Sequence, residues 1–283
     1  MTLPPLAAEV MFNIGPLPVT NSLINSSLTL VGFAVFALFI QLGVRKYYTK
    51  HEKAPKGLIN FFEALLEFML SYFDQVTSDR KKSLKFLPII GSFFLFILVS
   101  NWMGLLPGTG SIGIWQVHNG SIELIPLFRP SNSDLNMTLA MAVLAVGMSH
   151  ILGIVAIGFF KYLNKFIKLG DLFKAIISFN PVKILVAVIE FFVGVIEIFS
   201  EIAKMVSLSL RLYGNVFAGE VLLTVLAGLI SVVVPLPFIA LEIIVGLIQA
   251  VVFSMLTLVY LNLATQDHGH AEDKGHGETS VAV

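Results

Sequence analysis

The sequence predicts an all-α polytopic membrane protein with about five membrane-inserted helices and one interfacial amphipathic helix. Of its 283 residues, 56% are hydrophobic and only 13% are charged, whereas soluble domains carry about 25% charged residues. Several apolar runs reach the roughly 20 residues that a helix needs to cross a hydrocarbon core about 30 Å thick. We therefore expect a single membrane domain over residues 1–283, embedded in lipid.

Composition excludes several other classes. The net charge is zero and no basic block occurs, so we expect no nucleic-acid partner. The lack of cysteine excludes disulfides and thiolate metal sites. The sequence has no glycine-rich phosphate loop, metal cluster or nucleophile triad, so we expect no cofactor, no metal and no catalytic site in this chain.

Three apolar runs in the first 160 residues should each span the membrane once. The runs cover residues 23–44, 86–106 and 134–160. Ser133 or Asp134 could cap the third run at its N-terminus, since short polar side chains accept hydrogen bonds from a first helical turn. Residues 1–22 would form an outer N-terminal segment, and residues 107–133 would form a long outer loop.

Residues 57–79 form a more polar segment between the first two runs. One helical face carries apolar side chains, and acidic residues occur at positions off this face. The apolar face comprises Phe61, Leu65, Phe68 and Tyr72, and the acids are Glu63, Glu67 and Asp74. This pattern favours an amphipathic helix lying along the membrane interface.

The last long apolar stretch, residues 181–264, predicts a tilted helical hairpin. Residues 182–229 contain neither proline nor a polar loop, so Pro181 would begin one helix of nearly 50 residues and about 70 Å. That length exceeds the membrane thickness, so the helix must tilt, bend or extend beyond the core. Pro235 and Pro237 mark the turn before the final run, 238–264, and residues 265–283 would be a flexible tail.

Basic residues set the predicted orientation. They cluster after the first run, before the second run and between residues 161 and 183, which places all three clusters on one side. By the positive-inside rule this side and the C-terminal tail are cytoplasmic, most simply in a bacterial plasma (inner) membrane. Lys204 and Arg211 belong to none of these three clusters, because they lie inside an apolar helix.

A charged stripe is predicted on that helix. Four charged residues recur every seven positions, a spacing that drifts only about 20° per step on an α-helix. They are Glu190, Glu197, Lys204 and Arg211, bordered by Ser200, Ser207 and Asn215. Inserting an arginine at the centre of a membrane helix costs roughly 2.5–3.5 kcal/mol of free energy. We therefore expect Arg211 to have a functional role. The stripe could line a hydrated channel open to the cytoplasm, or pack against another subunit.

A second polar pocket is predicted beyond Arg211. Glu220 lies nine residues after Arg211 and on the opposite helix face. Glu242 and Gln249 are seven residues apart and share a face of the last helix. In an antiparallel hairpin, Glu220 and Glu242 would lie at comparable depths on the outer side. Alternatively, Glu242 is an ordinary interfacial carboxylate near the turn.

Two offset half-channels separated by a fixed positive charge would couple ion flow to the movement of a partner subunit. A carboxylic acid on a moving partner crosses lipid when protonated, but its ionised form needs a countercharge. Arg211 can supply it without passing on a proton itself, since an arginine guanidinium keeps its proton in proteins. Ions would then cross only by movement of the partner.

Five segments carry a resemblance to the F-type ATP synthase a subunit that covers nearly the whole chain. SLSLRLYGNVFAGE at 207–220 resembles the signature of that family. LIQAVVF at 247–253 with LVYL at 258–261 resembles its last helix, and NWMGLLP at 101–107 and DLN at 134–136 match weaker landmarks.

The resemblance implies a stator role in a rotary complex. Arg211 would face the rotor ring of c subunits, whose carboxylates carry the ion, and the peripheral-stalk b subunits would be further partners. Asn215, Glu220, Glu242 and Gln249 would serve the outer half-channel. Glu197 and its neighbours would serve the inner half-channel.

The sequence departs from the family pattern at one pair of positions. Many members pair a histidine with a carboxylate where this chain has Glu220 and Glu242. Two carboxylates in contact would titrate as a coupled pair. The histidines of this chain lie elsewhere. His51, His118 and His150 are isolated in the sequence. His268, His270 and His276 lie in the tail, where we expect a solvated segment in preference to a metal site.

Two alternatives stay open from other classes. A secondary transporter would also bury charges, but its usual signature is an internal repeat, and none is found. An ion-pumping subunit of a respiratory complex could also line proton paths with lysine and glutamate, but it would not require the motif from Arg211 to Glu220.

Overall fold

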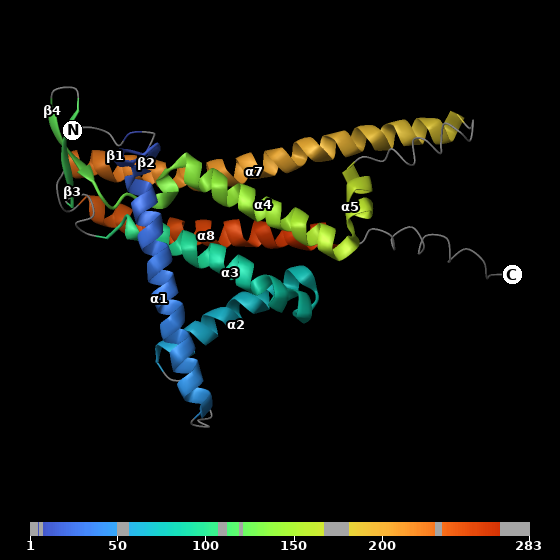
Figure 1. Ribbon diagram of the computed structural model, residues 1–283, viewed down its shortest axis with the longest axis horizontal. Helices are drawn as coiled ribbons and strands as arrows, with labels where there is room; N and C mark the ends of the chain where they lie inside the picture. The colour runs from blue at the N-terminus through green and yellow to red at the C-terminus, as the bar shows by residue number, and fades with distance from the viewer. Residues whose placement is uncertain are drawn as a thin grey trace. The chain divides into compact units, whose positions relative to one another are not determined.

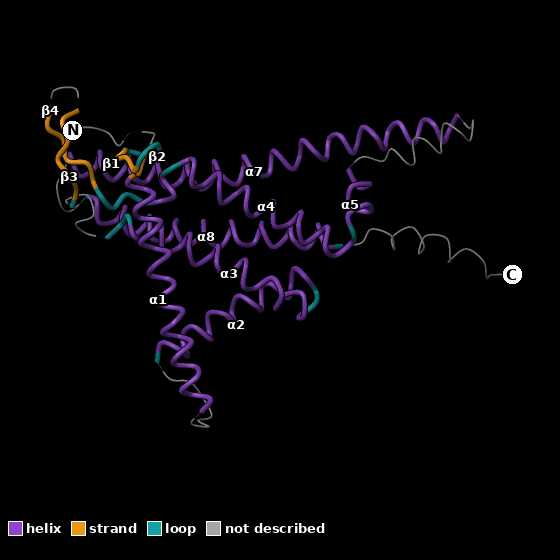
Figure 2. Tube along the Cα trace, in the orientation of Figure 1, coloured by secondary structure: helices purple, strands orange, loops and turns teal. Residues whose placement is uncertain are grey.

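The computed structural model describes residues 5, 8–49, 57–106, 112–118, 121–166, 181–229 and 234–266. Helices dominate these residues, and strands occur only in two short hairpins (Figure 1, Figure 2). Four helices are long and apolar enough to cross a membrane. They are α1 (Asn21–Thr49), α3 (Arg80–Met103), α4 (Leu135–Ile157) and α8 (Pro235–Thr265). The predicted all-α polytopic membrane fold is confirmed.

Helix α7 (Pro181–Leu229) is the long helix expected from the sequence. Its 49 residues form one uninterrupted α-helix, although it is not among the four helices selected by length and hydropathy. The turn at residues 230–233 lies outside the described residues, and so does the tail from residue 267. The tilt of the hairpin and the flexibility of the tail stay predictions.

The chain divides into two compact units. Unit 1 comprises residues 1–142 and 206–258, and unit 2 comprises residues 143–205 and 259–283. Helices α4, α7 and α8 each run through both units. The single membrane domain predicted for residues 1–283 therefore stays a prediction.

A buried polar belt ties together the elements of unit 1. The Asn25 amide donates to the backbone carbonyl of Arg129 at 2.8 Å, and the Asn132 amide donates to the Asn101 side-chain oxygen at 2.7 Å. The Asn101 amide in turn donates to the carbonyl of Gly246 at 3.2 Å. These bonds join α1, α3, α8 and the segment before α4, which fixes the part of α8 that carries Glu242 and Gln249.

Asp134 caps α4, as the sequence allowed. Its carboxylate accepts from the backbone N–H of Asn136 at 3.0 Å and from the Ser22 hydroxyl at 2.8 Å. The first contact satisfies a free N–H of the first helical turn, and the second ties that turn to α1.

Helix α2 (Leu58–Thr77) forms where the amphipathic segment was predicted. Met69, Leu70 and Phe73 are buried, and the helix packs on α3. Phe61 and Phe68, from the predicted apolar face, are exposed. Because apolar side chains stay uncovered, this face suits contact with lipid, and its place at the interface stays a prediction.

The predicted outer segments contain strands that the helix-period analysis did not anticipate. Strand β1 (Val10–Ile14) pairs with β2 (Leu17–Thr20), and β3 (Gly113–His118) pairs with β4 (Ser121–Pro126), both antiparallel. A 3₁₀ turn, η2 (Ser131–Ser133), follows. Short hairpins satisfy backbone groups locally, so a long connection need not be irregular.

The third predicted span ends three residues earlier than expected. Helix α4 stops at Ile157, and a separate helix α5 (Phe159–Phe166) follows. Gly158 between them has φ 96°, a left-handed conformation that glycine adopts without the penalty other residues incur. The chain therefore changes direction at Gly158.

Candidate functional site

Arg211 lies on an uncovered face of α7 in unit 1. Its side chain is exposed and makes no hydrogen bond or ion pair with any residue that the structure describes. Leu208 and Leu212 bury another side of the same helix, and Ser209 approaches Thr138 of α4, with hydroxyl oxygens 3.3 Å apart. The helix is thus anchored on one side while Arg211 projects from another.

Small side chains surround Arg211 on its exposed face. Ala203, Ser207, Gly214 and Ala218 are all exposed, and their spacing places them on one helical face. A Cβ atom added to Gly214 would meet nothing within 4 Å. Such a face lets another helix approach the backbone closely, as small residues do in membrane helix packing.

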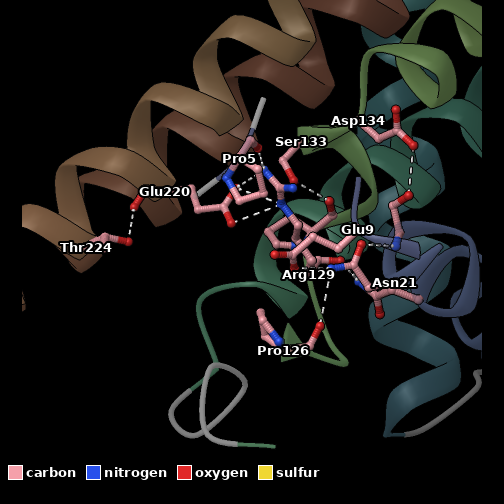
Figure 3. Close-up of polar contacts among 12 residues, drawn as sticks. Pro5, Glu9, Asn21, Pro126, Arg129, Ser133, Asp134, Glu220 and Thr224 are labelled. Carbon is pink, nitrogen blue, oxygen red and sulfur yellow. Dashed lines mark hydrogen bonds and ion pairs between the residues drawn. The ribbon is translucent and has the colours of Figure 1, made fainter. Parts of the chain in front are cut away.

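Arg129 of unit 1 forms an ion pair that sequence reasoning missed. Its Nε lies 3.1 Å from Glu220 Oε1, and both Nε and Nη2 donate to Oε2 at 3.2 Å. Nη2 also donates to the carbonyl of Pro5 at 2.7 Å, and Figure 3 shows the guanidinium between these partners. The Arg129 side chain is 2% exposed and that of Glu220 is 20% exposed, so this is a buried charge pair.

The signal for Arg129 was present in the sequence. It is the one lysine or arginine between residues 86 and 160. It lies in the predicted outer loop, on the side of the membrane that the positive-inside rule leaves poor in positive charge. Burying an unpaired arginine is costly, so an isolated arginine there needs an acidic partner. Glu220 lies 91 residues further along the chain, and sequence spacing gave no indication of that pairing.

Glu242 packs against Gly219, the residue before Glu220. The Glu242 carboxylate occupies the place that a Cβ on Gly219 would take, so the lack of a side chain at Gly219 permits the contact. Gly219 directly precedes Glu220, which brings the α7 and α8 segments predicted to form the outer pocket side by side. No contact joins Glu220 to Glu242 directly among the described residues, and Arg129 pairs with Glu220.

Gln249 lies two turns further along α8. It is 5% exposed, and its amide nitrogen has no hydrogen-bond partner among the described residues. Leaving a buried donor unsatisfied costs about 1–3 kcal/mol. Gln249 thus keeps an unsatisfied donor inside unit 1. Asn215, the remaining predicted outer residue, is exposed on α7.

The predicted inner residues lie on the part of α7 that belongs to unit 2, except Ser207. Glu190, Glu197 and Lys204 are all partly exposed. Lys204 Nζ bonds Glu201 Oε1 at 2.7 Å and lies 5.1 Å from the centroid of the Tyr260 ring. Glu201 does not follow the seven-residue spacing, and for that reason the sequence prediction omitted it.

Comparison with known protein families shows to which family the chain belongs. A family model described as the ATP synthase A chain matches residues 26–262. The chain belongs to this family. A subunit a of ATP synthase from Gloeobacter violaceus is 30% identical over 92% of the chain and 90% of its own length. Those of Moorella thermoacetica and Campylobacter jejuni subsp. doylei are 29% and 31% identical, over 92% and 78% of the chain and 96% and 80% of their own lengths.

Membership of the ATP synthase A chain family confirms the resemblance found in the sequence. The chain is an integral membrane subunit of an ATP synthase complex, and it is not the subunit on which ATP chemistry takes place. No group of three or more His, Cys, Asp or Glu that could hold a metal occurs in the described part of the chain. The histidine-rich tail lies outside it.

Proposed function

We propose that this chain conducts protons through the membrane sector of an ATP synthase and couples their flow to rotation of a c-subunit ring. The observation that carries the proposal is Arg211, a charged side chain on an uncovered, otherwise apolar or small-residue face of α7. An unpaired charge in that position requires an ionic partner on another chain. A carboxylate on the rotor has the right charge and is displaced when the ring turns.

The outer half of the path would run along α7 and α8. Arg129 pairs with Glu220, so Glu220 has a fixed countercharge. Glu242 lies against Gly219 with no ion pair among the described residues. We assign proton uptake from the outer side to Glu242, with Glu220 holding the local geometry, Gln249 lining the path as a buried polar group and the exposed Asn215 offering a polar contact toward the rotor.

The inner half of the path would run along α7 before Arg211. Glu190, Glu197, Lys204 and Ser207 supply polar groups there, and Arg211 separates this half from the outer one. Arginine stays protonated at physiological pH, so it blocks direct proton transfer between the halves. Protons would then cross only on the rotor carboxylates.

The orientation follows from the basic clusters. We place these clusters and the C-terminal tail on the cytoplasmic side of a bacterial plasma (inner) membrane. Family membership supports the c-ring and the peripheral-stalk b subunits as neighbours within the complex.

Vesicles carrying the assembled complex test the proposal. Arg211→Ala should abolish ATP-driven proton pumping and raise the passive proton leak, while the complex still assembles. Arg80→Ala is the matched control, because Arg80 is an exposed arginine that pairs with Asp74 outside this path and should leave pumping intact. Pumping by Arg211→Ala near the native rate would overturn the proposal.

A further inference from the structure

A cavity in unit 2 brings together polar residues that the sequence left scattered. Its volume is about 320 Å³, and its walls come from α4, α5 and α7. Most of the lining side chains are apolar, and the polar ones are His150, Tyr162 and Glu201. At roughly 30 Å³ per water molecule, the cavity has room for several waters beside these three groups.

The three polar groups form one connected chain of contacts. His150 Nδ1 lies 2.6 Å from the Tyr162 hydroxyl oxygen, and His150 Nε2 lies 3.8 Å from Glu201 Oε2. The other Glu201 oxygen bonds Lys204 at 2.7 Å. The 3.8 Å separation exceeds hydrogen-bond length, so His150 Nε2 and Glu201 Oε2 are in electrostatic contact without a hydrogen bond between these two atoms.

Tyr162 is suited to position the histidine but not to carry the proton. It lies in α5, beyond the end of the α4 span. Burial raises the pKa of the Tyr162 hydroxyl to about 12, with a further contribution from the negative charges of Glu201 and Glu197. The phenol therefore stays protonated at neutral pH, and its contact with Nδ1 fixes the ring with Nε2 toward Glu201.

Lys204 connects this cluster to the proposed path. It belongs to the charged stripe predicted on α7, and it lies seven residues before Arg211 in the sequence. Instead of standing alone, it bonds Glu201 and lies over Tyr260 of α8. The polar stripe and the cavity thus meet at the Glu201–Lys204 pair.

We propose that His150 and Glu201 are the proton-relay residues on the inner side of the path, with Tyr162 and Lys204 as positioning residues. This inference rests on the proposed function. A proton arriving through water binds the Glu201 carboxylate or the His150 imidazole, and the same group later releases it to water, so no other bond is made or broken. Histidine suits this role because its ordinary pKa of about 6.5 lies close to neutral pH.

The charged surroundings make the relay sensitive to pH on the inner side. Tyr162 and Glu201 face His150 directly. Lys204 bonds Glu201 and lies over the Tyr260 ring, and Glu197 acts on Tyr162. A positive charge on His150 is favoured by Glu201 and opposed by Lys204, so protonation of His150 changes the charge balance of the whole cluster.

The test compares variants in inverted vesicles, where the medium reaches the inner side, and measures the ATP-driven proton-pumping rate against the pH of the medium. Glu201→Gln should lower the rate at least tenfold, somewhat less than the roughly 10²–10⁴ that a positioned acid or base contributes, since water can substitute in part. His150→Gln should flatten the pH profile near neutrality. His118→Gln, in strand β3, is the matched control and should behave like the native chain.

The outcomes separate this inference from the proposed function. If Arg211→Ala stops pumping while Glu201→Gln and His150→Gln keep the native rate and pH profile, the relay is wrong and the proposed function stands. A drop by the same factor at every pH in His150→Gln would also overturn the relay, since a purely structural role of His150 predicts it. If Glu201→Gln does not assemble, the pH profile of His150→Gln decides alone. Pumping that survives Arg211→Ala contradicts the proposed function itself.

Discussion

Arg211 and Arg129 are both arginines of unit 1, but their surroundings differ completely. Arg129 is 2% exposed and bonded to Glu220 and to the Pro5 carbonyl. Arg211 is exposed and has no partner among the described residues. An arginine whose charge is satisfied within its own chain supports structure. One whose charge is unsatisfied needs a partner that arrives from outside, which is what a rotor requires.

The largest effect on stability should come from breaking the Arg129–Glu220 pair. Arg129→Met leaves Glu220 without its countercharge, and removing one partner of a buried ion pair costs about 3–5 kcal/mol. Arg211→Met, the matched control, removes an unpaired and exposed charge and should leave the chain folded. The thermal unfolding midpoint and the yield of the purified complex measure both. Equal losses for the two variants would contradict the comparison.

The pair can be tested further by removing both charges. Arg129→Met combined with Glu220→Gln should recover part of the stability lost in Arg129→Met, because no uncompensated charge stays buried. A double variant less stable than Arg129→Met would show that the two residues do not act as a pair.

Two glycines of α7 sharpen the same comparison between a filled face and an open face. A Cβ at Gly219 would overlap the Glu242 carboxylate, whereas a Cβ at Gly214 would meet nothing within 4 Å. Gly219→Ala should therefore destabilise the chain by about 1–3 kcal/mol, as overpacking does.

Gly214→Ala should instead leave the chain stable, with up to about 1 kcal/mol gained from helix propensity. It should nevertheless slow proton pumping, because the added methyl group lies on the face proposed to meet the rotor. Unfolding midpoints and pumping rates of both variants provide the check. Native pumping by Gly214→Ala would count against close helix contact at this face.

The glycine between α4 and α5 should have a moderate effect confined to unit 2. Gly158 has φ 96°, and holding alanine in such a conformation costs about 1–3 kcal/mol. Gly158→Ala should lower stability and disturb the contact between Tyr162 and His150. Gly147→Ala is the matched control, since Gly147 lies within α4 and a Cβ there meets nothing within 4 Å. Equal unfolding midpoints for the two variants would show that the turn at Gly158 is not strained.

The smallest effect should be at Asp74, outside the spans. The nearby Ser83 hydroxyl and the Arg80 guanidinium lower the pKa of the Asp74 carboxyl below its usual 3.8, against an opposing effect of desolvation. A lowered pKa means that the stabilisation is present above pH 3.8 and is lost as the pH falls through the value in the folded chain. The difference in unfolding midpoint between the native chain and Asp74→Asn should therefore shrink on acidification. A difference that grows would reverse the sign of the argument.

The sequence predicted what depends on local pattern and composition. Apolar runs located the spanning helices, and the rarity of arginine in apolar helices singled out Arg211. The Asp134 cap could be read from its place before an apolar run.

What the sequence did not predict depends on contacts between distant residues. Glu220 meets Arg129 across 91 residues, and Tyr162 reaches His150 because the chain turns at Gly158 between α4 and α5. A positive φ at one glycine leaves no periodic signal, so the end of α4 was placed too late. The roles of the predicted site residues in ion transfer stay predictions, since they depend on a partner chain.

Cross-linking tests the central claim most directly. The chain has no cysteine, so Gly214→Cys introduces a single thiol one turn from Arg211 on the exposed face. Paired with a cysteine placed beside the ion-carrying carboxylate of the c subunit, it should form a disulfide in the assembled complex on mild oxidation. Ser27→Cys, exposed on α1, should not. A disulfide at residue 27 but none at residue 214 would contradict the account, because Arg211 would then not face the rotor.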